Sequence, residues 1–306
     1  MYILGLDIGG TKCAAVIAAV NNGSIEFLDR HEVKTTSDWK HILGLLCAWA
    51  NAKATDLGII LSSVGISCGG PLSADRKYIL SPPNLYGWDK VPVVEFVEEL
   101  CKTKAYLEND ADACALAEYR YGAGAKSNSM IFLTFGTGFG AGIILEEKLY
   151  RGVSGMAGEI GHVRIAEDGP VGYGKEGSME GYASGGGIAR LAYSYGMRAT
   201  KDKELSAKYV IEEARSGNKE ALKVIATSAS KLGKGLAVLV DILNPDTIVI
   251  GSIYSRAEDL FKDIVDKELQ KECLKGTYEA VRILPAGLSE RIGDYGAICA
   301  ALYHIE

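Results

Sequence analysis

Apolar side chains follow two different periods along the chain. Short runs rich in valine, isoleucine and leucine are typical of buried strands, and they occur at residues 59–68, 105–107, 130–134 and 247–250. Between these runs the apolar residues recur at helical spacing, which predicts helices at residues 39–53, 92–100, 111–120, 219–243 and 293–303. Strands that alternate with helices in this way predict an α/β protein.

A turn of glycine and threonine joins two apolar strands near the N-terminus, and a similar turn recurs in the second half. Residues 6–17 align without a gap with residues 133–144. Glycine lets backbone N–H groups approach a ligand, and threonine adds a hydroxyl donor, so each turn suits an anion. The repeat predicts two related lobes that hold one polyphosphate between them. A tight turn that needs glycine's φ freedom explains either copy on its own.

The clearest break in the pattern is Tyr-Gly-Ala-Gly-Ala at residues 121–125. We therefore expect a small α/β lobe at residues 1–121, completed by a C-terminal helix at residues 293–306, and a large α/β lobe at residues 122–292. Residues 152–187 are rich in glycine and lack a regular hydrophobic pattern throughout. A loop region of that length in a compact chain is usually functional.

Composition narrows the possible partners. The chain has 306 residues, enough for two domains, and a formal charge of −6 without a basic run. This charge argues against nucleic acid as the main partner. It is compatible with a nucleotide ligand, because backbone dipoles and Mg²⁺ can bind the phosphates. The apolar run at residues 13–20 is too short to span a membrane, and there is no basic leader, so we expect a cytoplasmic protein. Seven scattered cysteines without a CxxC pair are expected to be reduced.

Asp7 and Lys12 flank the first glycine turn. A carboxylate beside a phosphate is useful only if a cation lies between them, so we expect Asp7 to position Mg²⁺ through water. A turn aspartate that bonds its own backbone is the alternative. Lys12 either neutralises phosphate as a point charge or is a solvated hairpin lysine.

Asn109 and Asp110 follow a predicted strand, at the kind of strand end where open α/β sheets bind ligands. Asp110 there is suited to accept a proton from a substrate hydroxyl that attacks a γ-phosphate, while Asn109 orients the substrate. A helix N-cap explains Asp110 equally well.

Glu159, His162 and Glu180 form a third group of candidates. A ligand with many hydroxyls is best held by groups that accept and donate hydrogen bonds, and two carboxylates with a histidine supply that combination. Glu159 and His162 are three residues apart, so one helical turn can direct both at one ligand. Hydrolase and Walker-type signatures (GxSxG, HExxH, GxxxxGKS) are absent from the sequence.

Five short motifs, in this order along the chain, resemble those of the ROK family of bacterial sugar kinases and sugar-responsive repressors, within the actin-like and hexokinase-like ATPase superfamily. They occupy residues 7–12, 108–111, 136–140, 158–162 and 177–180, and the resemblance runs essentially end to end. It implies a two-lobed actin-like ATPase (ribonuclease H-like) fold with duplicated strand-hairpin cores. It also implies transfer of the γ-phosphoryl group of ATP, with Mg²⁺, to a hexose hydroxyl, and a homodimer.

The resemblance assigns roles to individual residues. Asp110 is the general base. The sugar is held by Gly70, Asn109, Asp110, Glu159, His162 and Glu180, and ATP with Mg²⁺ by Asp7, Gly9, Gly10, Thr11, Lys12, Gly136, Thr137, Gly138 and Gly251. Glucose phosphorylated on its 6-hydroxyl is the first expectation, with N-acetylglucosamine or N-acetylmannosamine as alternatives. Some relatives use polyphosphate in place of ATP.

Two other functions of the superfamily are disfavoured. A sugar-responsive transcription regulator needs a DNA-binding segment ahead of the first turn, and Asp7 leaves no room for one. A filament-forming actin relative would not need Glu159, His162 and Glu180, because it binds no ligand with many hydroxyls.

The sequence departs from the family at two places. Zinc-binding members carry three cysteines in a CxCGxxGC pattern, and here those positions hold Val171, Tyr173 and Ser178. Valine has no donor atom and such sites need thiolates, so we predict no structural zinc. Ser252 stands where many relatives have a second glycine, so the loop on the nucleotide side also differs.

Overall fold

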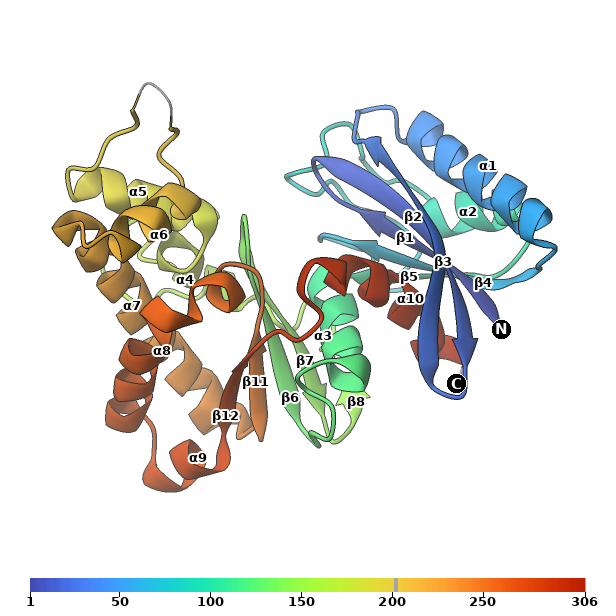
Figure 1. Cartoon of the computed structure of the whole chain (residues 1–306). Helices are drawn as coiled ribbons and strands as arrows, with labels where there is room; N and C mark the ends of the chain where they lie inside the picture. Colours follow the sequence, from blue (N-terminus) through green and yellow to red (C-terminus); the bar gives the residue numbers. More distant parts are fainter. Residues whose placement is uncertain (201–202, 306) are drawn as a thin grey trace. The chain divides into compact units, whose positions relative to one another are not determined.

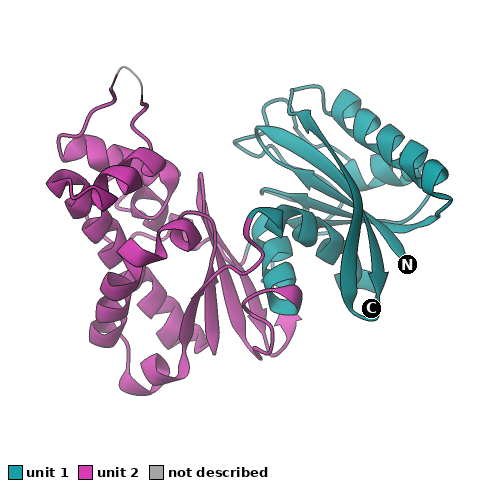
Figure 2. Ribbon diagram, viewed as in Figure 1, with its two compact units in different colours: residues 1–120, 151–156, 290–306 teal, residues 121–150, 157–289 magenta. Residues whose placement is uncertain are grey.

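The computed structural model describes residues 1–200 and 203–305, which form two compact units. Unit 1 comprises residues 1–120, 151–156 and 290–306, and unit 2 comprises residues 121–150 and 157–289 (Figure 2). The short segment 151–156, which the sequence places with the second lobe, groups with unit 1. Each unit contains a five-stranded sheet (Figure 1).

The sheet of unit 1 has the strand order β3-β2-β1-β4-β5. Neighbours β1, β2 and β3 are antiparallel, whereas β4 and β5 run parallel to β1. The strands are β1 (Tyr2–Ile8), β2 (Lys12–Asn21), β3 (Ser24–Lys34), β4 (Leu61–Cys68) and β5 (Ala105–Asn109). The helices of unit 1 are α1 (Trp39–Leu57), α2 (Val93–Cys101), α3 (Asp110–Tyr121) and α10 (Ile292–Ile305).

Helices cover both faces of this sheet (Figure 1). α1 and α2 pack on one face, and α10 packs on β1, β4 and β5 from the other. Glycine makes the second contact close, because a Cβ on Gly65 would lie 1.9 Å from the carbonyl oxygen of Ala297 in α10. The C-terminal helix therefore lies directly on the sheet backbone.

The sheet of unit 2 repeats the same topology with the order β12-β11-β6-β7-β8. Here β6, β7 and β8 are antiparallel, and β11 and β12 run parallel to β6. The strands are β6 (Met130–Phe135), β7 (Phe139–Leu145), β8 (Lys148–Leu149), β11 (Thr247–Ile250) and β12 (Arg282–Pro285). The hairpins β1–β2 and β6–β7 are thus equivalent in the two sheets, as the repeated glycine turn predicts.

The helices of unit 2 include one whose ends match the prediction. α7 (Lys219–Leu243) begins at Asn218, whose side chain accepts from the Ala221 N–H, and ends at Asn244 in the left-handed conformation. The others are α4 (Met179–Tyr182), α5 (Gly185–Ser194), α6 (Ala207–Arg215), α8 (Ile253–Glu272) and α9 (Lys275–Ala280).

The structure differs from the prediction at the end of one strand and in the glycine-rich region. β5 does not end at Leu107 but continues to Asn109, because Asn109 still pairs with Cys68 of β4. The glycine-rich region contains short elements as well as loop: a 3₁₀ turn η1 (Ile160–His162), the hairpin β9 (Val171–Gly172) and β10 (Lys175–Glu176), and α4. A second 3₁₀ turn, η2 (Ser289–Arg291), precedes α10.

Candidate active site

The candidate residues divide between the two units. Unit 1 contains Asp7, Gly9, Gly10, Thr11, Lys12, Gly70, Asn109 and Asp110. Unit 2 contains Gly136, Thr137, Gly138, Glu159, His162, Glu180 and Gly251. Each unit therefore carries one glycine turn and part of the expected sugar-binding set.

The first glycine turn reverses the chain between β1 and β2. The Gly9 N–H donates to the carbonyl of Lys12 at 3.1 Å, which closes the turn. Gly10 lies against a loop not recognised in the sequence, because a Cβ there would meet the carbonyl oxygen of Asn84 at 2.5 Å. Lys12 pairs with Glu32 at 2.9 Å and stays mostly exposed, so its ammonium is held at the surface of the turn.

Asp7 lies at the end of β1 in a strongly acidic environment. Burial, followed by the charges of Asp110 and Asp294, raises its pKa to about 6, while Arg30 and Lys12 oppose this rise. Asp294 comes from α10, whose Gly293 brings the helix close: a Cβ at Gly293 would lie 2.5 Å from Asp7 Oδ2. No pattern in the sequence indicates that Asp294 lies beside Asp7. A buried carboxylate whose pKa is raised by neighbouring acids, as that of Asp7 is, fits a divalent cation, whose charge relieves the repulsion.

Asn109 and Asp110 lie where β5 passes into α3. The Ala111 N–H donates to Asp110 Oδ1 at 2.8 Å and to Asn109 Oδ1 at 3.0 Å, so both side chains cap the helix. Asp110 Oδ2 faces Gly69, where a Cβ would lie 3.6 Å away. Burial raises the pKa of the Asp110 carboxyl, partly offset by backbone hydrogen bonds. The cap uses one oxygen and leaves the other on the side of the glycine loop.

The loop after β4 brings Gly70 to the same place. A Cβ on Gly70 would lie 3.3 Å from the Asn109 amide nitrogen. The absence of a side chain at Gly69 and Gly70 therefore keeps the space beside Asn109 and Asp110 open. The structure brings Gly70, Asn109 and Asp110 together.

The second glycine turn, between β6 and β7, meets two other loops of unit 2. The Gly136 N–H donates to the Gly138 carbonyl at 3.1 Å, and the Gly136 carbonyl accepts from the N–H of Gly185 at the start of α5 at 2.8 Å. Ser252 also lies close, because a Cβ on Gly136 would be 3.6 Å from its hydroxyl oxygen. The second glycine turn, the N-terminus of α5 and the loop before α8 thus lie together, and a glycine turn beside a helix N-terminus is the type of surface that binds phosphate.

Gly251 and Ser252 connect β11 to α8. The Gly251 N–H donates to the Leu133 carbonyl at 2.9 Å, and a Cβ there would lie 3.1 Å from the Phe132 ring. Ser252 has a φ of +56°. Positive φ values favour glycine. Ser252 therefore adopts a backbone conformation that glycine would adopt more easily.

Glu159 and His162 are placed by two glycines that touch β7. A Cβ on Gly158 would lie 1.9 Å from the Ala141 carbonyl oxygen, and one on Gly161 would lie 2.0 Å from that of Phe139. The His162 N–H donates to the Glu159 carbonyl at 3.1 Å within this turn. The glycine spacing of the motif is therefore required by backbone packing on β7.

Glu180 joins this segment to the second glycine turn. Its Oε2 accepts from the Phe139 N–H at 3.1 Å, and a Cβ on Gly138 would lie 2.9 Å from the same oxygen. A Cβ on Gly161 would lie 3.5 Å from the Glu180 Cβ. Unit 2 therefore brings the Gly158–His162 segment, Glu180 and the second glycine turn into one place.

The positions of the family's zinc cysteines have other contacts. Val171 is exposed, and the Tyr173 ring packs edge-on against His162 with 5.5 Å between the centroids. The Ser178 hydroxyl donates to the Gly172 carbonyl at 3.0 Å and caps α4 through the Gly181 N–H. Hydrogen bonds and a ring contact thus hold this hairpin to its surroundings.

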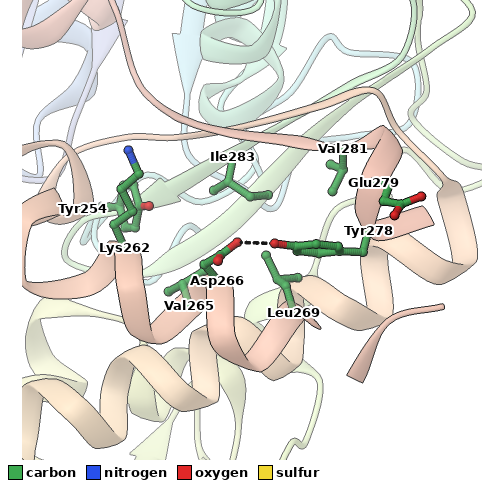
Figure 3. Close-up of a pocket in the computed structure, with 9 residues that line it drawn as sticks. All are labelled: Tyr254, Lys262, Val265, Asp266, Leu269, Tyr278, Glu279, Val281 and Ile283. Carbon is green, nitrogen blue, oxygen red and sulfur yellow. Dashed lines mark hydrogen bonds between the residues drawn. The ribbon is translucent and has the colours of Figure 1, made fainter. Parts of the chain in front are cut away.

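A cavity of about 310 Å³ in unit 2 lies between α8, α9 and β12 (Figure 3). Its apolar wall includes Val265, Leu269 and Ile283, and at one side the Tyr278 hydroxyl donates to Asp266 at 2.8 Å. None of the candidate residues lines it.

No helix among residues 1–200 and 203–305 is both long and apolar enough to cross a membrane.

The fold and motifs define a two-lobed kinase-like protein of the actin-like ATPase class. The sequence pattern of the ROK family matches residues 3–304, and the chain belongs to that family. Repressors also occur in it.

Two relatives and one solved structure illustrate the similarity. The glucokinase of Streptomyces coelicolor is 31% identical over 96% of this chain and 95% of its own length. The N-acetylmannosamine kinase of Shigella boydii is 34% identical over 84% of this chain and 85% of its own. The structure of a ROK family glucokinase from Streptomyces griseus in complex with glucose and AMPPNP has a TM-score of 0.78 and 32% identity, covering 97% of this chain and 98% of that one.

Proposed function

We propose that this protein is an ATP-dependent sugar kinase that transfers the γ-phosphoryl group to the 6-hydroxyl of a hexose, with glucose as the substrate. The observation that carries the proposal is the geometry of Asp110. Its carboxylate lies at the end of a parallel strand, with Oδ1 held by the Ala111 N–H and Oδ2 beside the open glycine loop. A buried carboxylate with a raised pKa suits a general base.

In the proposed reaction the sugar hydroxyl oxygen attacks the γ-phosphorus. The new O–P bond forms while the bond from the γ-phosphorus to the β–γ bridging oxygen breaks, and ADP leaves. Asp110 accepts the hydroxyl proton through Oδ2. Asn109, anchored by its own hydrogen bond to Ala111, orients the same sugar.

The remaining sugar contacts are assigned to unit 2. Glu180 uses one oxygen to accept from the Phe139 N–H, which fixes the carboxylate for a sugar hydroxyl. Glu159 and His162 lie on a turn that two glycines hold against β7. Gly70 provides space beside Asn109 in unit 1.

The two glycine turns are assigned to the nucleotide, Gly9 to Lys12 in unit 1 and Gly136 to Gly138 with Gly251 in unit 2. Mg²⁺, when bound with ATP, neutralises charge on the transferred phosphoryl group. Asp7 is the residue that would hold it, directly or through water. Asp7 is close enough to Asp110 and Asp294 for their charges to raise its pKa, so it fits this role.

Glucose is preferred because the Streptomyces griseus relative, similar over nearly the whole chain, is described with glucose and AMPPNP. N-acetylglucosamine and N-acetylmannosamine are the alternatives, since discrimination at the second carbon depends on pocket shape and not on the shared acceptors. The phosphoryl donor is proposed to be ATP, with polyphosphate as the alternative.

A coupled assay of ADP release, run with glucose, mannose, N-acetylglucosamine and N-acetylmannosamine, tests the proposal. We expect glucose to give the highest kcat/KM and glucose 6-phosphate to form in equal amount with ADP. Absence of sugar-dependent ADP formation with every sugar would refute the kinase activity. Sugar binding by calorimetry without turnover would then favour a sugar-sensing regulator.

A further inference from the structure

Two arginines and two buried acids form an ion cluster beside Asp110, and the proposed mechanism does not use it. Its members, all in unit 1, are Arg76, Glu108, Asp112 and Arg151. Glu108 is 0% exposed and Asp112 is 3% exposed. Buried charges are costly unless they are paired, so a cluster of this kind needs a reason to be kept.

Glu108 uses both carboxylate oxygens in this cluster. Oε1 accepts from Arg76 Nε at 3.0 Å and from the backbone N–H of Asn109 at 3.1 Å. Oε2 accepts from Arg151 Nε at 2.9 Å and also from Arg151 Nη2. One side chain thus binds two guanidinium groups and fixes the peptide that leads into Asn109 and Asp110.

Arg76 extends the cluster to the other side of Asp110. Its Nη2 donates to Asp112 Oδ2 at 3.4 Å and to the Gly155 carbonyl at 3.1 Å. Gly155 has a φ of +74°, and a Cβ there would lie 3.3 Å from Arg76 Nη1. Asn109 and Asp110 therefore lie between two acids that a single guanidinium binds.

The same contacts hold the segment 151–156 at both ends. Arg151 binds Glu108 at its start, and the Gly155 carbonyl accepts from Arg76 near its end. Arg151 also lies over the Tyr303 ring of α10, 5.1 Å from the centroid. Two residues after this segment the chain reaches Gly158, which begins the turn that carries Glu159 and His162.

We propose that Glu108, through Arg76 and Arg151, is a positioning residue for the phosphoryl transfer: it fixes the peptide before Asn109 and Asp110 and anchors the chain segment that leads to Glu159. The inference rests on the proposed function. Glu108 acts through its neighbours, because its carboxylate is fully occupied by arginine and backbone donors.

A positioning role and a merely structural one differ in their kinetic signature. A structural defect lowers the active fraction, so kcat falls while KM for sugar and KM for ATP stay unchanged. A displacement of the sugar-binding residues raises KM for sugar as well. Misplacement of about 1 Å costs about 100-fold in rate, so the effect is measurable without loss of the fold.

The test compares Glu108→Gln, Arg151→Gln and Arg151→Lys with Glu99→Gln, an exposed glutamate of the same unit. For Glu108→Gln and Arg151→Gln we expect KM for sugar to rise at least about tenfold, kcat to fall about tenfold or more, and KM for ATP to stay within about twofold. Arg151→Lys keeps the charge without the planar fork and should fall between wild type and Arg151→Gln. Glu99→Gln should match wild type.

Arg151 is partly exposed, so its variants stay informative if Glu108→Gln fails to fold. Unchanged KM for sugar in both Arg151 variants would overturn the inference while leaving the kinase activity intact. Hydrogen exchange of the free protein gives a readout that does not depend on turnover: Arg151→Gln should speed exchange at residues 108–112 and 151–162. If wild type phosphorylates no sugar, the proposed function fails, and unchanged exchange would then overturn the positioning role too.

Discussion

The carboxylate of Glu180 accepts a hydrogen bond from the backbone N–H of Phe139 at 3.1 Å. This bond ties a proposed sugar-binding side chain to the strand that follows the second glycine turn. Gly138 permits it, because any side chain there would press on the same oxygen. The proposed sugar-binding and phosphate-binding residues of unit 2 are therefore mechanically linked.

This link predicts the effect of Gly138→Ala. The added methyl group would lie 2.9 Å from Glu180 Oε2, so the carboxylate must move. We expect KM for sugar to rise about tenfold, with KM for ATP raised as well, since the turn itself is altered. Glu180→Gln retains an oxygen for the Phe139 N–H and should raise KM for sugar alone. An unchanged KM for sugar in both variants would contradict the assignment of Glu180.

Asp110→Asn is expected to remove most of the catalysis. The amide retains an oxygen for the Ala111 N–H, so the helix cap and the fold should survive, but it cannot accept the hydroxyl proton. We expect kcat to fall by about 10²–10⁴-fold with KM for sugar little changed. Asp56→Asn, at an exposed position of α1, is the matched control. Full activity of Asp110→Asn would show that another group is the base.

The pH profile follows from the protonation state of Asp110. Burial raises the pKa of this carboxyl above the ordinary value of about 3.9. Only the ionised form accepts a proton, so kcat/KM should be full above the raised pKa and should fall as pH decreases through it. Initial rates from pH 4 to pH 8 measure this. A profile that stays level down to about pH 4 would contradict the raised pKa.

Asp7 should make stability depend on pH in the opposite way to a salt-bridged carboxylate. Its pKa rises to about 6 in the native state, so the native carboxyl binds its proton more tightly than the unfolded one. Native stability is then lost as pH rises from about 4 to about 6, by up to about 3 kcal/mol. The asparagine of Asp7→Asn cannot ionise, so this variant should not lose stability over the same pH range.

Urea unfolding of wild type and Asp7→Asn in EDTA, at pH 4 and pH 7.5, tests this expectation. The free energy of unfolding of the variant relative to wild type should increase between the two pH values. The same variant should lose kinase activity, because the proposed Mg²⁺ contact is gone. If the difference in free energy of unfolding between the variant and wild type is the same at both pH values, ionisation of Asp7 does not destabilise the native state.

Gly161→Ala should be strongly destabilising, because its Cβ would lie 2.0 Å from the Phe139 carbonyl oxygen and both groups are backbone. We expect a loss of about 2–3 kcal/mol in the free energy of unfolding, comparable to overpacking in a core. Gly276→Ala, in α9 with open space around it, is the control and should gain about 0.5–1 kcal/mol. Equal behaviour of the two variants in thermal unfolding would refute the packing argument.

The hairpin at Val171, Tyr173 and Ser178 predicts a protein without structural zinc. Ser178 stands where zinc-binding members of the family have a cysteine ligand, and its hydroxyl is hydrogen-bonded to the Gly172 carbonyl and the Gly181 N–H. Metal analysis of purified protein should find well under one zinc per chain, and EDTA should leave Tm unchanged. About one tightly bound zinc per chain would contradict the prediction.

Local signals in the sequence were sufficient for elements with clear ends. α7 is predicted at its observed bounds because Asn218 caps its start and Asn244 takes the left-handed conformation after it. β3 was missed because its residues are mostly half-exposed and lack an apolar run. α8 was missed because it is rich in charge and contains a non-helical residue, Ala257. These elements gain their structure from neighbours far away in sequence.

The same distinction holds for the candidate site. Motif spacing predicted Asn109, Asp110 and Glu180. The structure places Glu180 beside Gly138 of the second glycine turn, whereas Asn109 and Asp110 lie beside Gly70 and Gly69 of the loop after β4, outside the five motifs. Asp294 beside Asp7, and Arg76 and Arg151 on Glu108, depend on contacts across long stretches of chain. Single residues of this kind carry no pattern in the sequence, so only the folded chain reveals them.

The assembly of unit 1 from three separate stretches has a consequence for how the protein is made. Its sheet is formed by strands within residues 2–109, yet α10, which covers one face of that sheet, comes from Ile292–Ile305, far later in the chain. During synthesis, the face of β1 and β4 that α10 covers stays uncovered until residues 292–305 have been translated. The domain that begins first is therefore completed last, and a truncated product lacking α10 is left with an uncovered apolar surface, prone to aggregation.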